Sequence, residues 1–396
     1  MSGPATEAGG KARVLRVLQV SAFFRGHGGG IETVADELAH RVPCRDFVVH
    51  WMAGDHGGEA PIGPFPVGLE VEAVRSFDPL ESRIGLPMPL WGPHALRRLW
   101  RAVGRADLVH IHDYLYQPSL MALLFAWLRN KPTVITQHIG EIPFASQRAR
   151  ALLEALNRHL GARVLARAGR TAFVGAPVQN YFEKRTRFER PPKLVPNGVD
   201  LDRFRPGTDD RVLRSPEVQL LFVGRFVEKK GLRLLVPCLD LPGVHWTFVG
   251  WGPQSPVERS NERVTLAGRL APEAIVPHYQ QADLLVLPST GEGFPLVVQE
   301  ALACGTPVLV SSEVAAAFPA LDDACVFAVD LQAPDPSVRL REVLAELAAN
   351  PTRLSAARVA ARGLAGQWSW DRCAEAYREL YRCATRNTHA VSASRK

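Results

Sequence analysis

Short apolar runs rich in β-branched residues alternate along this chain with amphipathic stretches of helical periodicity. Such alternation is typical of parallel sheets whose strands are connected by helices, so it predicts an α/β fold. The runs fall into two sets of similar size, which fits two doubly wound, Rossmann-like units. The predicted strands are Val14–Val20, Phe47–Met52, Leu108–His112, Thr133–Gln137, Thr171–Val174, Leu194–Pro196, Gln219–Val223, Trp246–Val249, Val264–Ala267, Leu284–Leu287, Val308–Val310 and Cys325–Val329.

The boundary between the two sets follows the turn residues Pro196-Asn197-Gly198. A length of 396 residues agrees with two domains. We therefore predict a flexible N-terminus at 1–12, a first domain at 13–200, a second domain at 201–368, a C-terminal helix at 369–386 and a flexible tail at 387–396.

Composition narrows the class of protein. Hydrophobic residues make up 46% of the chain and charged residues 22%, which is ordinary for globular domains. The longest apolar stretch, Leu120–Leu128, is shorter than the roughly 18 residues that cross a bilayer, so no membrane span is predicted. No secretory signal is visible, and the six cysteines form no CxxC pair. We therefore expect a protein of the reducing cytoplasm.

Positive charge is concentrated in the first half of the chain. Residues 1–200 hold 25 Lys and Arg against 18 Asp and Glu, and residues 94–190 alone hold 16 against 6. This excess suggests an anionic partner or surface. Within it, apolar residues at helical spacing are interleaved with arginines: Leu96, Leu99, Trp100 and Val103 with Arg97, Arg98, Arg101 and Arg105.

A second basic stretch with an apolar side, made of Leu152, Leu153, Leu156, Leu160 and Val164, runs from Gln147 to Arg170. Helices of this kind fit an anionic membrane surface, where they lie among the headgroups. They fit equally well in a protein core with a solvated basic face. Both interpretations stay open for both stretches.

A glycine-rich loop follows the first predicted strand. It contains Gly29 and Gly30 and leads into a helical run from Thr33 to His40. Glycines at such a position let a phosphate approach the backbone N–H groups at a helix start. The spacing is not that of a dinucleotide fingerprint, so the loop predicts contact with a phosphate or a sugar, with a flexible turn as the alternative.

Two cations, Arg225 and Lys230, follow the strand that ends at Val223. Ligands of open α/β sheets bind at the carboxyl ends of strands, and an Arg with a Lys across a loop is suited to a diphosphate. A solvated basic turn is the alternative interpretation.

The sharpest signal is the segment from Pro288 to Gly305. Pro295 suits the first position of a helix and Gly305 the position after its end, which predicts a mostly apolar, buried helix of about ten residues. Glu300 lies within this helix, whereas Glu292, Gly293 and Phe294 precede it. One element thus offers two carboxylates and free backbone N–H groups, as sugar hydroxyls and phosphates require. The alternative is a buried Glu paired with an Arg.

Three other sequence features carry weaker signals. His138 ends a predicted strand, where a ligand contact and a structural role are equally reasonable. His110 and His112 lack a third metal ligand, and the Asp200-Leu201-Asp202 sequence lies in the turn between the domains. We therefore expect no metal site.

Glu292 and Glu300 are separated by seven residues, with Glu-Gly-Phe-Pro at the start and Glu-Ala-Leu-Ala-Cys-Gly-Thr-Pro-Val at the end. This pattern resembles the EX7E motif of retaining glycosyltransferases of family GT4. The resemblance implies the GT-B fold, in which two Rossmann-like domains face each other across a cleft. Further matching segments are Gly29–Glu32, His112-Asp113, Thr136–His138, Pro196–Asp200, Val223–Gly231, Gly250–Pro253 and Ala267–Arg269.

The resemblance also implies a role for individual residues. Arg225 and Lys230 would hold the donor diphosphate, which Gly29 and Gly30 would let approach the first domain. Glu300 would bind the ribose hydroxyls. Glu292 and His138 would contact the transferred sugar. The amides of Gly293, Phe294 and Leu296 would contact the sugar and the phosphate, and Arg269 and Leu270 would contact the base.

The sequence thus predicts a hexosyltransferase that keeps the anomeric configuration and needs no metal or other cofactor. Its donor would be a UDP-, GDP- or ADP-sugar, and its acceptor a glycan or a lipid-linked molecule, in polysaccharide, lipopolysaccharide or glycolipid assembly. No nucleic acid partner is expected. The anionic inner face of the cell membrane is a candidate surface to which the protein would bind. A nucleotide-sugar epimerase of the same fold and a non-catalytic binding protein remain as alternatives.

Overall fold

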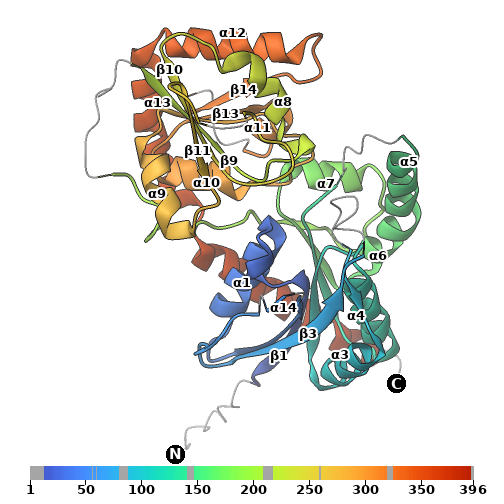
Figure 1. Ribbon diagram of the computed structural model, residues 1–396. Coiled ribbons are helices and arrows are strands. Elements are labelled where there is room, and N and C mark those ends of the chain that lie inside the picture. The colour runs from blue at the N-terminus through green and yellow to red at the C-terminus, as the bar shows by residue number, and fades with distance from the viewer. Residues whose placement is uncertain are drawn as a thin grey trace, which may run out of the picture. The chain divides into compact units, whose positions relative to one another are not determined.

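The computed structural model describes residues 13–55, 57–58, 60–79, 88–140, 147–207, 217–257, 260–318 and 324–393. The N-terminus predicted to be flexible, at 1–12, lies outside them. Contacts divide the described chain into two units (Figure 1). Unit 1 takes its residues from Met1–Ile135, Ala168–Arg170 and Ala374–Lys396, and unit 2 from Thr136–Arg167 and Thr171–Cys373. The domain limits at 200 and 368 stay predictions.

The first sheet has eight strands in the order β4-β3-β2-β1-β5-β6-β7-β8. Every strand predicted for the first half is present. Two more, β3 and β4, were missed because charged residues interrupt the apolar run of β3, and β4 is only two residues long. The strands are β1 (Leu15–Phe23), β2 (Phe47–Asp55), β3 (Leu69–Phe77), β4 (Leu90–Trp91), β5 (Leu108–His112), β6 (Thr133–Gln137), β7 (Arg170–Phe173) and β8 (Lys193–Leu194).

Helices cover both faces of this sheet. The last helix, α14, packs on unit 1 through aromatic residues: the Tyr381 hydroxyl lies 2.9 Å from Nδ1 of His110, and its ring contacts Phe47. It continues beyond the predicted end at Arg386. The helices are η1 (Arg25–His27), α1 (Gly30–Arg41), α3 (Pro93–Arg105), α4 (Gln117–Leu128), α5 (Gln147–Leu156), η2 (Asn157–Gly161), α6 (Ala162–Arg167), α7 (Ala176–Glu183) and α14 (Trp370–Ala393).

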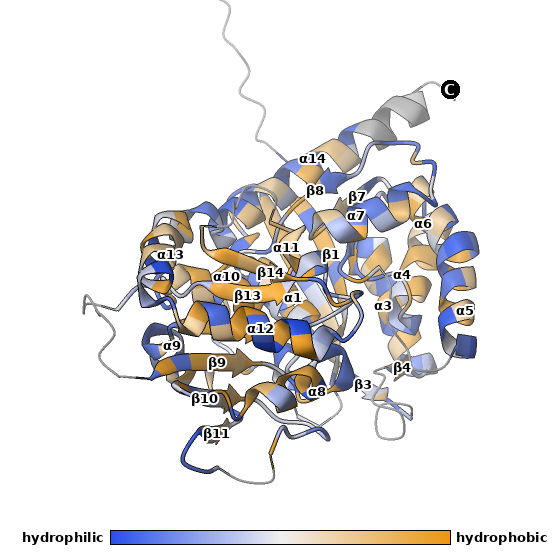
Figure 2. Ribbon diagram, turned by 90° about the horizontal axis from the view of Figure 1, so that it is seen from above, coloured by the Kyte–Doolittle hydropathy of each residue, from blue (hydrophilic) through white to orange (hydrophobic). Residues whose placement is uncertain are grey.

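The second sheet has six strands in the order β11-β10-β9-β12-β13-β14, and neighbouring strands are parallel. All six predicted strands are present and most of their apolar residues are buried, as the orange strands β9 and β13 illustrate (Figure 2). The strands are β9 (Val218–Val223), β10 (Val244–Val249), β11 (Val264–Gly268), β12 (Leu284–Leu287), β13 (Val308–Ser311) and β14 (Val326–Val329).

The helices that connect the strands of this second sheet complete its core. They are η3 (Glu228–Lys230), α8 (Leu232–Leu235), η4 (Val236–Cys238), α9 (Pro272–Gln281), α10 (Leu296–Ala303), α11 (Ser312–Ala315), α12 (Pro336–Ala348), α13 (Pro351–Leu364) and η5 (Ala365–Gln367). The chain therefore forms two doubly wound α/β sheets, and the predicted fold class is confirmed. Among the described residues, no helix combines the length and the apolar character that crossing a membrane requires.

The two basic stretches differ in structure. In α3, Leu99 and Val103 are fully buried in unit 1, so the core-packed interpretation holds for the apolar face of this helix. The second stretch is not one continuous α-helix, because a π-helical turn separates α5 from α6. Its predicted apolar side is divided: Leu153 is buried, whereas Leu152 is 63% exposed.

Candidate functional site

The strand order of the second sheet reverses between β9 and β12, which are neighbours in the sheet although β10 and β11 separate them in sequence. In open α/β sheets, ligands bind beyond the carboxyl ends of the strands at such a reversal. Here the loop after β9 carries Arg225 and Lys230, and the loop after β12 carries Glu292. The two sharpest signals of the sequence thus lie at one place in the fold.

Glycines bring the loop after β9 close to its neighbours. Gly231 has a φ of +72°, and a Cβ atom there would overlap the carbonyl oxygen of Pro288. Gly224 lies under the side chain of Lys230, whose Cε would be 3.6 Å from an added Cβ. The lysine side chain is therefore directed along the loop toward the end of β12.

Lys230 forms an ion pair with Glu292, with Nζ 2.8 Å from Oε1, and the Nζ of Lys229 lies 4.0 Å from the same oxygen. Both partners of the closer pair are largely buried, with 14% and 13% of their side chains exposed. Burial tends to raise the pKa of Glu292, but the ammonium groups of Lys230 and Lys229 outweigh burial and hold this pKa below its usual value. Glu292 is therefore a carboxylate at neutral pH.

Backbone hydrogen bonds hold the loop that carries Glu292. The N–H of Thr290 donates to the carbonyl of Lys229 at 2.9 Å, and the N–H of Gly291 donates to the carboxylate of Glu313 at 3.1 Å. These bonds connect the loop to the loop after β9 and to α11, so the position of Glu292 is set from both sides.

The backbone of His138 lies against Gly293. A Cβ atom at Gly293 would overlap the carbonyl oxygen of His138, and one at Gly175 would overlap the carbonyl of Gly293. Glycine is therefore needed at both positions by close packing. The imidazole of His138 is buried, and burial lowers the pKa of His138 to about 3. It is neutral at physiological pH and suited to a hydrogen bond rather than to a charge.

The helix that follows differs in detail from its prediction. Pro295 is the N-cap of α10 rather than its first helical residue, and the helix has eight residues instead of about ten. Its predicted end is confirmed, because Gly305 follows the C-cap with a φ of +77°. Leu296, the first helical residue, is half-buried.

The side chain of Phe294 points into the core rather than into a site. Its ring stacks on Phe318 at a centroid distance of 4.4 Å. Its carbonyl accepts a hydrogen bond from the side-chain amide of Asn197 at 3.1 Å, and the side-chain amide of Gln299 donates to the carbonyl of Asn197 at 2.6 Å. The Asn197 turn thus anchors both the start and the middle of α10. Only the backbone of Phe294 is suited to a ligand.

Glu300 is half-exposed, whereas the sequence predicted a fully buried carboxylate. Its Oε2 atom accepts a hydrogen bond of 2.7 Å from the hydroxyl of Tyr279 in α9. Burial and then the adjacent Glu300 carboxylate raise the pKa of Tyr279 well above its ordinary value, so the phenol stays protonated and donates. Sequence reasoning missed Tyr279, because nothing in its neighbourhood marks a partner that lies 21 positions away.

Two more predicted residues follow β11. Gly268 has a φ of +70°, and its carbonyl accepts a hydrogen bond from Gly250 at 2.8 Å. The exposed guanidinium of Arg269 lies 4.4 Å from the ring centre of Trp251. Leu270 packs partly buried against the core. The backbone here lies beyond the carboxyl ends of β10 and β11. These strands belong to the same sheet as β12, which precedes the Glu292 loop.

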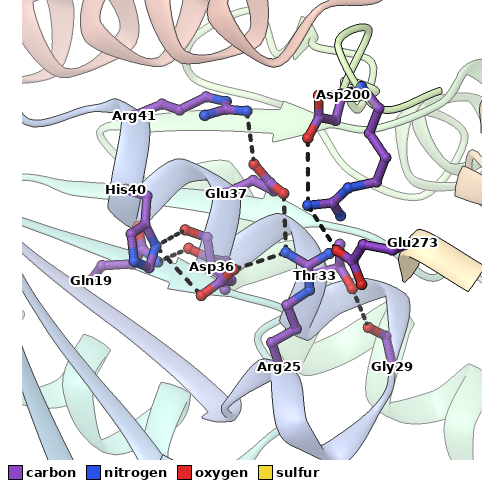
Figure 3. A network of polar contacts seen from close by, with 12 residues as sticks. Gln19, Arg25, Gly29, Thr33, Asp36, Glu37, His40, Arg41, Asp200 and Glu273 are labelled. Atoms are coloured by element: carbon purple, nitrogen blue, oxygen red, sulfur yellow. Dashed lines mark hydrogen bonds and ion pairs between the residues drawn. The ribbon is translucent and has the colours of Figure 1, made fainter. Parts of the chain in front are cut away.

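Gly29 and Gly30 belong to unit 1, where they begin α1 after the end of β1. A Cβ atom at Gly29 would overlap the buried carboxylate of Glu32, whereas Gly30 has open space around it. The Thr33 hydroxyl donates to the carbonyl of Gly29 at 3.0 Å (Figure 3). Gly29 thus lies against the end of the Glu32 side chain, and Gly30 is the position that leaves room for a ligand.

Ion pairs fasten η1 to α1 in unit 1. One nitrogen of Arg25 lies 3.1 Å from both the Asp36 and the Glu37 carboxylates, and Arg41 lies 3.3 Å from Glu37 (Figure 3). The Arg25 side chain therefore holds the glycine loop against its helix.

The weaker metal signals have structural explanations. The Oδ1 atom of Asp200 accepts from the backbone N–H groups of Asp202 and Arg203, each at 3.2 Å, which is the pattern of a turn cap. The Asp200 carboxylate also forms an ion pair with the Arg203 side chain at 3.8 Å. His110 is paired with Tyr381 of α14. In the part of the chain that the structure describes, no three His, Cys, Asp or Glu side chains are grouped to hold a metal ion.

Family models match both parts of the chain. Residues 28–203 match the model described as Glycosyltransferase Family 4, and residues 217–335 match that of Glycosyl transferases group 1. A D-inositol 3-phosphate glycosyltransferase of Catenulispora acidiphila is 31% identical over 82% of this chain and 83% of its own. One from Segniliparus rotundus is 34% identical, but there the match covers about half of each chain, 49% and 47%.

Solved structures resemble the whole chain more distantly. Anabaena HepE in complex with UDP and glucose matches with a TM-score of 0.70 and 17% identity, over 93% of this chain and 99% of that protein. A likeness at this level of identity concerns the fold.

Proposed function

The chain belongs to glycosyltransferase family 4, and from this premise we propose that it moves a hexose from a nucleoside diphosphate donor to an acceptor hydroxyl with retention of the anomeric configuration. Its two doubly wound sheets are those of the GT-B fold, as the sequence predicted. The observation that carries the proposal is the placement of Lys230 and Glu292 at the strand reversal of unit 2, beside the backbone of Gly293 and the start of α10.

The proposed chemistry begins with the departure of the nucleoside diphosphate. Negative charge then develops on the phosphate oxygen, and Lys230, Arg225 and the free N–H groups at the start of α10 would stabilise it. The loop bonds of Thr290 and Gly291 fix these donors before the substrate arrives, which reduces the reorganisation needed during the reaction.

Glu292 and Glu300 would have separate tasks. Glu292, already ionised and held by Lys230, would accept hydrogen bonds from the hydroxyls of the transferred sugar. Glu300, half-exposed and oriented by Tyr279, would accept them from the ribose. Glu292→Gln is then expected to lower kcat, whereas Glu300→Gln is expected to weaken donor binding.

Retention of configuration is supported by family membership and by the surroundings of His138. This imidazole is neutral, and the backbone carbonyl of His138 lies against Gly293, so the ring would donate or accept a hydrogen bond at the sugar without competing as a cation. The acceptor proton would pass to the departing phosphate oxygen on the same face of the sugar. Contacts of the base with the backbone at Arg269 and Leu270, and of the diphosphate with Gly29 and Gly30, complete the proposal.

The acceptor is proposed to be anionic or lipid-linked, at the inner face of the membrane or in the cytoplasm. The excess of positive charge at 94–190 supports an anionic molecule. Two relatives are D-inositol 3-phosphate glycosyltransferases, and an inositol phosphate is anionic too. Such a product would belong to the assembly of a glycolipid, a lipopolysaccharide or another glycan.

Product analysis tests this function. The protein is incubated with UDP-, GDP- and ADP-sugars, first alone and then with a panel of phosphorylated and lipid-linked acceptors, and NMR identifies the anomeric linkage. We expect an α-linked product from an α-linked donor and release of the nucleoside diphosphate. Inversion would contradict retention. Conversion of the donor into another nucleotide sugar without an acceptor would identify an epimerase, and binding without turnover of any acceptor would favour a binding protein.

A further inference from the structure

The helix α4 is apolar on all sides, but only one side of it is buried. Its sequence, Gln117 to Leu128, contains no charged residue. Small residues face the sheet of unit 1: Pro118, Ser119, Ala122 and Ala126 are buried. The large residues of its last turns point outward, because Leu124 is 43%, Trp127 74% and Leu128 53% exposed. The exposure of three large apolar side chains on one helix face marks an interaction surface.

A neighbouring helix adds positive charge to this surface. The helices α3 and α4 pack side by side in unit 1 (Figure 1), with the Trp100 ring edge-on to Phe125 at 5.1 Å and the Arg129 guanidinium 3.8 Å from the Trp100 ring centre. In α3, Arg97, Arg101 and Arg105 are exposed. Neither helix contains an Asp or a Glu, and Lys131 follows α4 directly.

Acidic groups of the neighbouring strand β3 also lie beside some of these cations. Glu70 and Glu72 of β3 line a hollow together with Arg98, Arg101 and Arg105. Glu72 is already engaged, since it pairs with Arg98 at 2.5 Å and with His50 at 2.8 Å. Cations therefore remain in excess next to the apolar face of α4.

We propose that the outward face of α4, with Leu124, Trp127 and Leu128, docks unit 1 on an anionic lipid bilayer while the arginines of α3 contact the lipid phosphates. This inference deepens the acceptor part of the proposed function. The membrane contact is then made by the neighbouring helix α4 instead of by the apolar face of α3, where Leu99 and Val103 are buried. A ridge of Trp and Leu beside arginines has the composition of interfacial helices, where apolar side chains enter the headgroup boundary and each nearby Arg adds attraction to anionic lipid.

Charge also argues against a second copy of the chain as the occupant. A symmetric dimer through α4 would place the exposed arginines of one α3 near those of its partner, which is unfavourable. A bilayer with anionic headgroups has the complementary charge.

Cosedimentation with lipid vesicles tests the proposal on the full-length chain. We compare phosphatidylcholine vesicles with vesicles of an equal mixture of phosphatidylcholine and phosphatidylglycerol, at low and high salt. The α4 variant combines Leu124→Gln, Trp127→Gln and Leu128→Gln, and the matched control carries Val338→Gln and Val359→Gln, which replace residues 55% and 69% exposed in unit 2. The wild type and the control are expected to bind the anionic vesicles at low salt, and the α4 variant about tenfold more weakly or worse.

A second variant, Arg97→Gln with Arg101→Gln, separates charge from insertion and is expected to lose the salt-dependent part of binding. The single variant Trp127→Gln, which changes one exposed side chain, serves if the α4 variant does not fold. Equal binding of the wild type and the α4 variant, or no binding by the wild type at low salt, would overturn the proposal. So would a dimer in solution that the α4 variant dissociates, because a second copy would then occupy this face.

Nucleoside diphosphate binding is measured on the same preparations. Loss of vesicle binding in the α4 variant with unchanged nucleotide binding supports the docking surface by itself. A wild type that binds vesicles through α4 but binds no nucleotide would remove the proposed function and leave the surface in place.

Discussion

Among single residues, Lys230 has two proposed roles. It would bind the donor diphosphate, and in the structure it neutralises the carboxylate of Glu292 at 2.8 Å. Removing one partner of a buried ion pair leaves the other charge uncompensated, which is far more harmful than replacing both partners. The residue that binds the ligand thus also stabilises the empty site.

Lys230→Met is expected to lower the free energy of unfolding by about 3 kcal/mol at pH 7. The sign of its pH dependence follows from Glu292, whose pKa is lowered in the folded protein. A carboxyl group whose pKa is lowered by folding stabilises the folded protein at pH values above its pKa in the unfolded chain, which is near 4.5. This stabilisation is lost as the pH falls through the pKa of the folded protein. The difference between wild type and variant should therefore shrink below pH 4.5. Urea unfolding at neutral and acidic pH measures it, and an equal difference at both pH values would contradict this role of Lys230.

Tyr279→Phe removes the hydroxyl that orients Glu300 and leaves the buried ring in place. We expect nucleoside diphosphate affinity to fall about tenfold, since a hydrogen bond to a charged group is lost. The double variant with Glu300→Gln should bind no more weakly than Glu300→Gln alone. The discriminating readout is a 2′-deoxynucleoside diphosphate, toward which Tyr279→Phe should have a smaller effect. Equal weakening for both ligands would indicate a purely structural hydroxyl.

At this scale the sequence predicted residue types better than their partners. The positions of Glu292, Lys230 and Gly293 follow from local patterns at strand and helix ends. Tyr279 could not be found in this way, because its contact with Glu300 depends on how distant segments fold together.

Among elements, the loop between β12 and α10 is fixed by close packing at Gly293.

The apolar runs of the buried strands were predictable because both faces of a parallel sheet are covered, whereas β3 alternates buried and exposed residues and was missed. The end of α10 was predictable from Gly305, but Pro295 suits both an N-cap and a first helical position. The division of the 147–170 stretch by a π-helical turn has no comparable signal in the sequence.

Gly293→Ala is expected to destabilise the protein by about 1–3 kcal/mol and to lower turnover, because the new methyl group would overlap the carbonyl of His138. Gly366→Ala is the matched control, since a Cβ atom there meets no neighbour. Thermal unfolding and transfer rates of both variants check this expectation. A Gly293→Ala protein as stable and active as the control would show that this contact does not constrain the loop.

For the molecule as a whole, family membership and two doubly wound sheets agree with the function predicted from the sequence, while donor and acceptor depend on contacts that only ligands reveal.

Metal independence is a prediction at this scale. Asp200 caps a turn, and His110 pairs with Tyr381 in the core. Transfer should therefore persist in excess EDTA at an unchanged rate. Abolition by EDTA with rescue by Mg²⁺ or Mn²⁺ would contradict this expectation.

The most direct test of the central claim, that the strand reversal of unit 2 binds the donor, is calorimetric titration of the wild type with UDP, GDP and ADP. The same titrations of Lys230→Ala and of Arg233→Ala, an exposed cation in α8 outside the site, complete the test. We expect at least one nucleoside diphosphate to bind the wild type and Arg233→Ala alike, and to bind Lys230→Ala about tenfold more weakly or worse. Equal affinity of the Lys230 variant, or no binding of any of the three by the wild type, would contradict it.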